Sequence, residues 1–171
     1  MTLFSIDLKG LTEDIIMVSW SLFRVMIPTL IIVKIAQDLG AVDTIDIWLK
    51  PVIELIGLPA SLSIVLTTTM LTNPYAGLIV LASVDLPLGL SVAETSILAS
   101  FMLFAHALPV EAVISRQAGT KIIFVVFLRV VTAIIFCFLL NQILTKFDLL
   151  QQTALIHLPE FQVAPSWFEW S

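Results

Sequence analysis

The chain has 171 residues, of which 59% are hydrophobic and only 12% are charged, with a formal net charge of −5 and a mean hydropathy of +1.08. A soluble globular domain carries about 25% charged residues, and a chain this short has too little interior to bury so much apolar surface. These values exclude a soluble domain. The acidic balance and the lack of a basic patch also argue against nucleic-acid binding.

The charged residues crowd between apolar runs, and these runs reach the ~20 residues that an α-helix needs to cross a bilayer. The runs are too long and alternate too weakly for the strands of a membrane barrel, so helices must satisfy the backbone hydrogen bonds in lipid. The sequence therefore predicts an all-α membrane protein with about four hydrophobic segments, two of them broken or re-entrant, plus an interfacial amphipathic helix. We expect a transmembrane domain over residues 1–146 and an interfacial or soluble tail over residues 147–171.

The first expected span, residues 14–35, carries Arg24 and Pro28 near its middle. Residues 37–59 are then amphipathic, because apolar side chains recur at helical spacing opposite acidic and basic ones. A helix lying in the membrane interface fits this pattern. A cap over the soluble side of the helix bundle is the alternative.

The next apolar segment, residues 60–84, is interrupted by Asn-Pro-Tyr-Ala-Gly at residues 73–77. Proline lacks an N–H donor and disfavours helical backbone at the residue before it, so we expect the helix to break at Asn73. Such a break offers an amide, free carbonyls and a phenol to a polar solute or small cation, with threonine hydroxyls at 67–69 nearby. Alternatively, the Asn-Pro pair only kinks the helix for packing. The candidate binding residues in this segment are Asn73, Pro74, Tyr75 and Gly77.

A second interruption follows in the apolar segment over residues 94–114. Ser91 and Glu94 have the spacing of a capping box, which predicts a helix start. The run is then broken by His106, Pro109 and Glu111, which complete the candidate site. Two interrupted hydrophobic segments are a pointer to the substrate site of transporters, where unwound backbone binds ions or solutes.

Four ionisable residues lie within the apolar runs: Arg24, His106, Glu111 and Arg129. Each costs a few kcal/mol at the bilayer centre, so each requires a partner, a cavity or a function. Glu111 could neutralise either arginine or serve a proton- or cation-coupled carrier, whereas the alternative is a charge pair that only fixes helix packing. His106 and Glu111 supply too few ligands for a metal. We expect no metal, no cofactor and no catalytic residue.

The last expected span, residues 122–144, contains Arg129 and the single cysteine, Cys137, which excludes an internal disulfide. The tail ends with Trp167 and Trp170, whose indole rings suit the headgroup region of a bilayer. We interpret this tail as a membrane anchor, with a soluble partner-binding segment as the alternative.

From the first span to about Arg129, the order of these features resembles the nucleoside-recognition, or Gate, domain family of bacterial inner-membrane proteins. The resemblance rests on an amphipathic stretch ending in Gly-Leu-Pro at 57–59, the broken segment at 73–77 and His-Ala-Leu-Pro-Val-Glu at 106–111. The chain is most similar to the small stand-alone members, such as YjiG and the spore maturation proteins A and B. The ferrous-iron gates of that family use cysteine near their breaks, whereas Cys137 lies elsewhere.

The resemblance implies a gate built from hairpins and interrupted helices, completed by a second copy or by a sister Gate-family subunit in the inner membrane. Our leading hypothesis is a multi-pass subunit of a transport or gating complex for a small polar solute or ion, with its site at the interrupted helices. The alternative is a membrane assembly or scaffold protein that transports nothing and whose broken helices fit a partner subunit.

Overall fold

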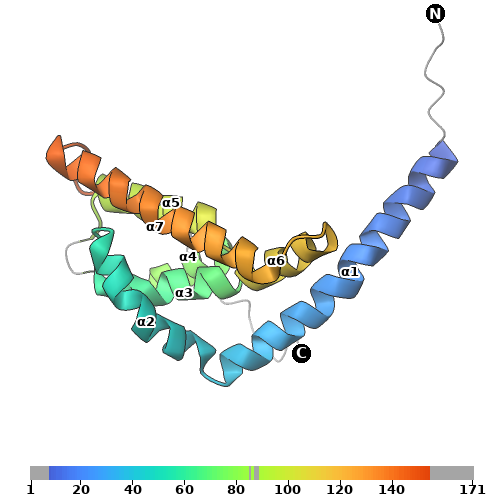
Figure 1. Ribbon diagram of the computed structural model, residues 1–171. Coiled ribbons are helices and arrows are strands. Elements are labelled where there is room, and N and C mark those ends of the chain that lie inside the picture. Colours follow the sequence, from blue (N-terminus) through green and yellow to red (C-terminus); the bar gives the residue numbers. More distant parts are fainter. Residues whose placement is uncertain (1–7, 85, 87–88, 155–171) are drawn as a thin grey trace, which may run out of the picture.

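The computed structural model describes residues 8–84, 86 and 89–154 (Figure 1). These residues form seven α-helices and one short 3-10 helix, with no strand among them, which confirms the expected all-α class. The elements are α1 (Leu8–Asp38), α2 (Ala41–Leu55), η1 (Ala60–Leu62), α3 (Ser63–Leu71), α4 (Pro74–Ser83), α5 (Val92–Ala105), α6 (Leu108–Gln117) and α7 (Ile122–Lys146).

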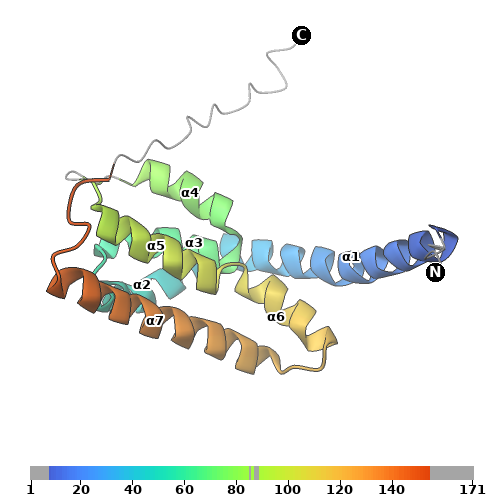
Figure 2. The same ribbon diagram turned by 90° about the horizontal axis from the view of Figure 1, so that it is seen from above.

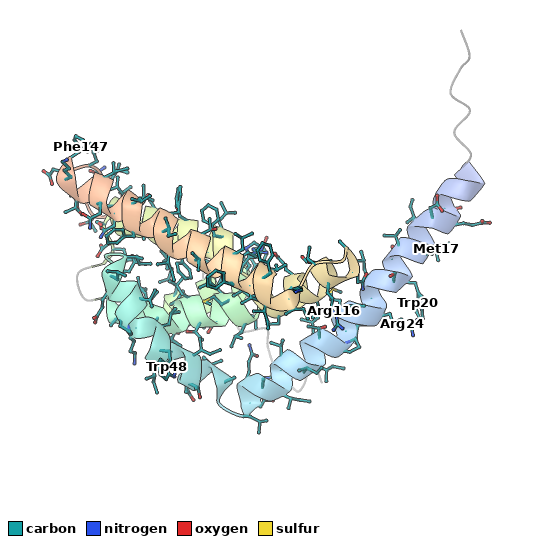
Figure 3. All side chains as sticks on the ribbon, viewed as in Figure 1. Met17, Trp20, Arg24, Trp48, Arg116 and Phe147 are labelled. Atoms are coloured by element: carbon teal, nitrogen blue, oxygen red, sulfur yellow. The ribbon has the colours of Figure 1, made fainter. Side chains whose placement is uncertain are left out.

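Helix α1 extends away from the other helices over most of its length (Figure 1 and Figure 2). Its 31 residues continue through Pro28 without a break, and it touches the bundle at α6 and α2. Apolar side chains such as Ile16 and Trp20 remain 68% and 71% exposed. Figure 3 shows Met17 and Trp20 projecting from α1 away from the bundle. A helix that is apolar on its exposed faces is suited to lipid rather than water.

The buried core lies between α2, α3, α5 and α7. Ile53 of α2, Leu66 of α3 and Phe101 of α5 are all 0% exposed. The thiol of Cys137 on α7 is buried there too, 3.5 Å from the carbonyl oxygen of Ile97. These large side chains hold four helices together, and they leave the outer faces of α1 and α7 apolar and exposed.

The expected amphipathic helix is present as α2, and its apolar stripe packs on α3. Leu49 and Ile53 of the stripe are buried in that contact, whereas Trp48, which also belongs to the stripe, is 78% exposed. Asp46 strengthens the contact, because its carboxylate accepts a hydrogen bond from Ser63 and lies 3.1 Å from Lys50 Nζ. Part of the stripe therefore faces protein. The position of α2 at a membrane surface stays a prediction.

Helices α3 and α4 form a hairpin that turns at Asn73, where the sequence predicts a break. Asn73 has extended backbone, with φ −162° and ψ 166°, and Pro74 occupies the first turn of α4. Four residues after the turn, Gly77 packs against Thr69, which lies four residues before it. The two short apolar helices thus run back along each other, as a re-entrant segment would.

Helices α5 and α6 behave differently at their break. The chain leaves α5 at His106 and enters α6 through Ala107, whose φ of 46° is in the left-handed region. Both helices then lie along α7, so the segment continues in one direction (Figure 2). Three stretches in the described residues are long and apolar enough to cross a membrane: 12–38, 92–117 and 122–146.

The start of the tail returns to the beginning of α5. The backbone N–H of Val92 donates to Gln152 O at 2.9 Å, and that of Ala154 donates to Leu90 O at 2.7 Å. These bonds attach residues 150–154 to the bundle. Trp167 and Trp170 lie outside the described residues, so the interfacial tail and the boundary near residue 146 remain predictions.

Candidate functional site

The two interruptions, distant in sequence, are joined in the structure by a backbone hydrogen bond. The N–H of Ala107, in the break between α5 and α6, donates to the carbonyl oxygen of Thr69 at 3.0 Å. Thr69 lies in the last turns of α3, just before the turn of the hairpin. The sequence predicted two breaks, and the tertiary structure brings them together.

Three ionisable side chains form a cluster at the second break. Glu111 Oε1 lies 2.8 Å from His106 Nε2, while Glu111 Oε2 forms an ion pair with the guanidinium of Arg129. The side chains of His106, Glu111 and Arg129 are 27%, 32% and 22% exposed. His106 and Glu111 are the fifteenth and twentieth residues of the 26-residue stretch 92–117, so the cluster lies in its second half. Each oxygen of the Glu111 carboxylate contacts one of the two basic side chains.

The ring of His106 connects the two helices that meet at this break. Its Nδ1 lies 3.0 Å from the carbonyl oxygens of both Met102 and Leu103. Carbonyl oxygens only accept hydrogen bonds, so these contacts require a hydrogen on Nδ1. The other ring nitrogen, Nε2, contacts Glu111. The imidazole therefore bridges the end of α5 and the first turn of α6.

The break itself places these side chains. Pro109 lies in the first turn of α6, where the missing N–H costs no helical bond. Glu111 follows in the same turn, where the positive end of the helix dipole favours a carboxylate. Arg129 Nε donates to the carbonyl oxygen of Phe104 at 2.8 Å, which satisfies an acceptor that the end of α5 would leave unpaired.

The first break uses its polar groups mainly for its own structure. The Asn73 side chain accepts a hydrogen bond from Ala76 N at 2.9 Å, so its oxygen caps α4. Pro74 starts that helix, and Gly77 allows it to approach α3. Tyr75 is 76% exposed. Asn73 thus caps α4 and Gly77 packs against α3, and the role of these residues in binding a solute stays a prediction.

Arg24 is not part of the cluster. It is exposed on α1, and Figure 3 shows its side chain projecting outward from that helix. Of the two arginines that Glu111 could neutralise, the structure pairs Arg129, because α7 and α6 pack side by side.

The threonines in α3 and at its C-terminal cap, Thr72, divide into two kinds. Thr69 Oγ1 donates to Val65 O at 2.9 Å, and Thr72 Oγ1 donates to Thr68 O at 2.5 Å, as helical threonines commonly do. Thr67 is fully buried, and within the described residues its hydroxyl is a buried polar group without a partner. A buried unpaired hydroxyl is uncommon and costs stability. The Thr67 hydroxyl is therefore a polar group on α3, close to the first break, that is available to form a hydrogen bond.

The sequence analysis missed a polar hollow elsewhere in the structure. It encloses about 250 Å³ between the start of α5 and the end of α7, beside the beginning of the tail. Ser91 and Glu94 were identified only as a helix cap, and they form that cap in the structure. The signal that could have found the hollow is Asn141, a polar residue in the apolar run of α7. Its polar lining residues are Ser91, Glu94, Asn141, Thr145 and Gln151.

Comparison with known proteins supports membrane association. The chain is 29% identical over 125 residues to the uncharacterized membrane protein YvoD of Bacillus subtilis (strain 168), and the match covers 73% of this chain and 39% of that protein. The chain thus spans less than half of the length of this relative. No family model matches the chain, and no solved structure matches it. The match and the apolar helices together identify a membrane protein.

Proposed function

We propose that the chain is a subunit of a transport or gating complex in the bacterial inner membrane and that it handles a proton, a small cation or a small polar solute at the joined breaks. The observation that carries the proposal is the cluster of His106, Glu111 and Arg129 next to the hydrogen bond between Ala107 and Thr69. Interrupted helices with ionisable groups beside them are the pattern from which transporters build their sites.

The contact between His106 and Glu111 supports a role in proton or cation coupling, because imidazole and carboxylate are both proton acceptors. A proton that moves between the two side chains leaves their net charge unchanged. A cation that binds Glu111 therefore either displaces a proton from the pair to solvent or takes the place of Arg129 beside the carboxylate. The resemblance of residues 57–59, 73–77 and 106–111 to the Gate family points in the same direction, toward a gate completed by a second copy or a sister subunit.

The scaffold hypothesis is kept because one observation favours it. Asn73 and Gly77 are engaged in capping and packing, and Arg129 binds the end of α5. These contacts are what a rigid fitting surface would need. In that case the charge cluster only holds α5, α6 and α7 together, and neutral side chains of the same shape would serve equally well.

The test uses neutral isosteres at the cluster. The E111Q/R129Q double variant removes both charges together, so neither is left without its counter-charge and we expect it to fold, whereas E111Q alone is destabilised by about 3 kcal/mol because Arg129 loses its carboxylate partner. The protein, purified with whatever copurifies, is reconstituted in liposomes. Entry of protons, Na⁺, K⁺ and uridine is then followed for each variant. The matched control is E54Q, an exposed glutamate on α2.

We expect one of these probes to enter with the wild type and with E54Q, and to lose most of its flux in the double variant and in H106Q. A double variant that melts like the wild type, recovers its partner and keeps full flux contradicts the proposed site. If no probe crosses with the wild type but partner recovery fails in the double variant, the scaffold hypothesis is supported instead.

A further inference from the structure

Two cations at the connector between α6 and α7 have no ion-pair partner in the described part of the chain. Arg116, in the last turn of α6, and Lys121, just before α7, are both exposed. Among the described residues, Lys34, Lys50 and Arg129 pair with carboxylates, whereas Arg24 and Lys146 do not. In a chain with a net charge of −5, two unpaired cations so close together in sequence make this connector a local concentration of positive charge.

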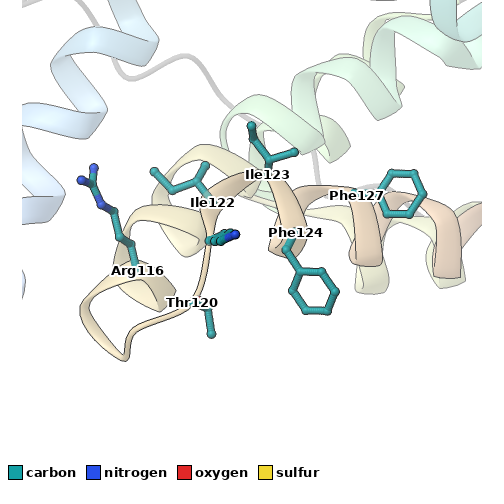
Figure 4. Close-up of a pocket in the computed structure, with 7 residues that line it drawn as sticks. Arg116, Thr120, Ile122, Ile123, Phe124 and Phe127 are labelled. Atoms are coloured by element: carbon teal, nitrogen blue, oxygen red, sulfur yellow. The ribbon is translucent and has the colours of Figure 1, made fainter.

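An apolar hollow opens directly beside these cations (Figure 4). It measures about 690 Å³ and is lined by Arg116 and Lys121 together with Ile122, Ile123, Phe124 and Phe127. A second hollow of about 520 Å³ shares three of these apolar residues and continues along α7 to Val130 and Val131. The two hollows lie next to each other along α7, since they share Ile122, Ile123 and Phe127, and we call them together the groove: its lining is charged at its beginning and apolar along its length.

The groove has the dimensions of a lipid. From Lys121 to Val131 the helix rises by about 15 Å along its axis, which is the scale of one acyl chain within a leaflet. Lys121 precedes the long apolar helix α7, so it lies where a spanning helix meets the headgroup layer. The first turn of α7 has no side-chain cap and no acidic residue, so its backbone also favours an anion there.

We propose that this groove binds an anionic phospholipid, with the lipid phosphate between Arg116 and Lys121 and one acyl chain along Ile123, Phe127 and Val130. The charge of the headgroup complements the two unpaired cations, and the apolar lining complements an acyl chain. The site lies on the outer face of α7, away from the cluster around Glu111, and it is independent of the transport proposal.

The experiment measures lipid adducts of the purified protein by native mass spectrometry. Phosphatidylglycerol and phosphatidylethanolamine with identical acyl chains are compared, and glycerol 3-phosphate serves as the headgroup without a tail. We expect a preference for phosphatidylglycerol that falls roughly fivefold in R116Q and in K121Q, since one basic residue near the membrane surface contributes about that factor. K146Q, at the opposite end of α7, is the matched control and should keep the preference.

The charge-preserving variant R116K/K121R should also keep the preference, which separates the loss of charge from a loss of folding. Equal binding of the two lipids by the wild type would overturn the proposal, and so would an equal loss in K146Q. Binding of glycerol 3-phosphate as strongly as the lipid would show an anion site without an acyl groove and would equally overturn it.

Discussion

Gly77 lies where α4 comes closest to α3, and no larger residue fits there. A Cβ atom at this position would collide with the hydroxyl of Thr69 and would lie 3.2 Å from Met102 Cε. Thr69 is fully buried, so it has no free space into which to move. The glycine is thus required by the closeness of two helices rather than by an unusual backbone angle.

We therefore expect G77A to lower the free energy of unfolding by about 1–3 kcal/mol, as overpacking in a core does. Equilibrium unfolding in detergent measures the loss. The control is the G77A/T69A pair, in which the colliding hydroxyl is absent, so the cost of G77A should be smaller in the T69A background. Purely additive losses in this double-mutant cycle would contradict the assigned contact.

The interrupted segments behave as elements with their own start and stop signals. In α5 the Ser91 hydroxyl accepts from Glu94 N at 3.1 Å, and the Glu94 carboxylate accepts from Ser91 N at 2.7 Å. This reciprocal box confirms the helix start that the sequence predicts. The same helix then ends at His106, whose ring caps its last carbonyls. Local signals of this kind need no distant partner to be identified.

The capping box gives a prediction for α5 as an element. S91A removes the acceptor of the Glu94 N–H and should lower stability by about 1 kcal/mol. S96A is a matched serine in the same helix, and its hydroxyl only donates back to Val92 O, so we expect a smaller change there. Thermal unfolding of both variants measures the difference, and a loss in S96A as large as that in S91A would argue against the box.

At the scale of the whole molecule, one face of α7 packs against α5, and the other face of α7 is apolar and exposed. Cys137 is 0% exposed on the inner face, whereas Leu139, two residues later on α7, is 54% exposed. This division assigns one face of α7 to the protein core and the other to lipid or a partner. It also makes the single cysteine a reporter of the packing between α5 and α7.

We expect Cys137 to react slowly with a membrane-permeant maleimide in mild detergent and rapidly in dodecyl sulfate, because the thiol is reached only when α5 and α7 separate. The C137A/L139C variant moves the thiol to the exposed face and should react rapidly in both conditions. Mass spectrometry of the labelled protein measures the extent of reaction. Rapid labelling of native Cys137 would show that α7 does not pack on α5 as described.

Much of the fold could be predicted because its signals are local. Composition and run length determined an all-α membrane protein, since no other backbone structure satisfies its hydrogen bonds along such runs. Pro74 and Pro109 determined where helices break, and Ser91 with Glu94 determined where one begins. Each of these effects depends on neighbours within about four residues.

The direction of the chain after each break is seen only in the tertiary structure. Helix α4 runs back along α3 after Asn73, whereas α6 continues in the direction of α5 after Ala107. Glu111 pairs with Arg129 and not with Arg24. A proline interrupts a helix without specifying the direction that follows, and an ion pair across helices depends on which faces meet. Both the direction of the chain and the partner of Glu111 depend on how α3, α5 and α7 pack around a common core. A local sequence pattern does not specify this packing.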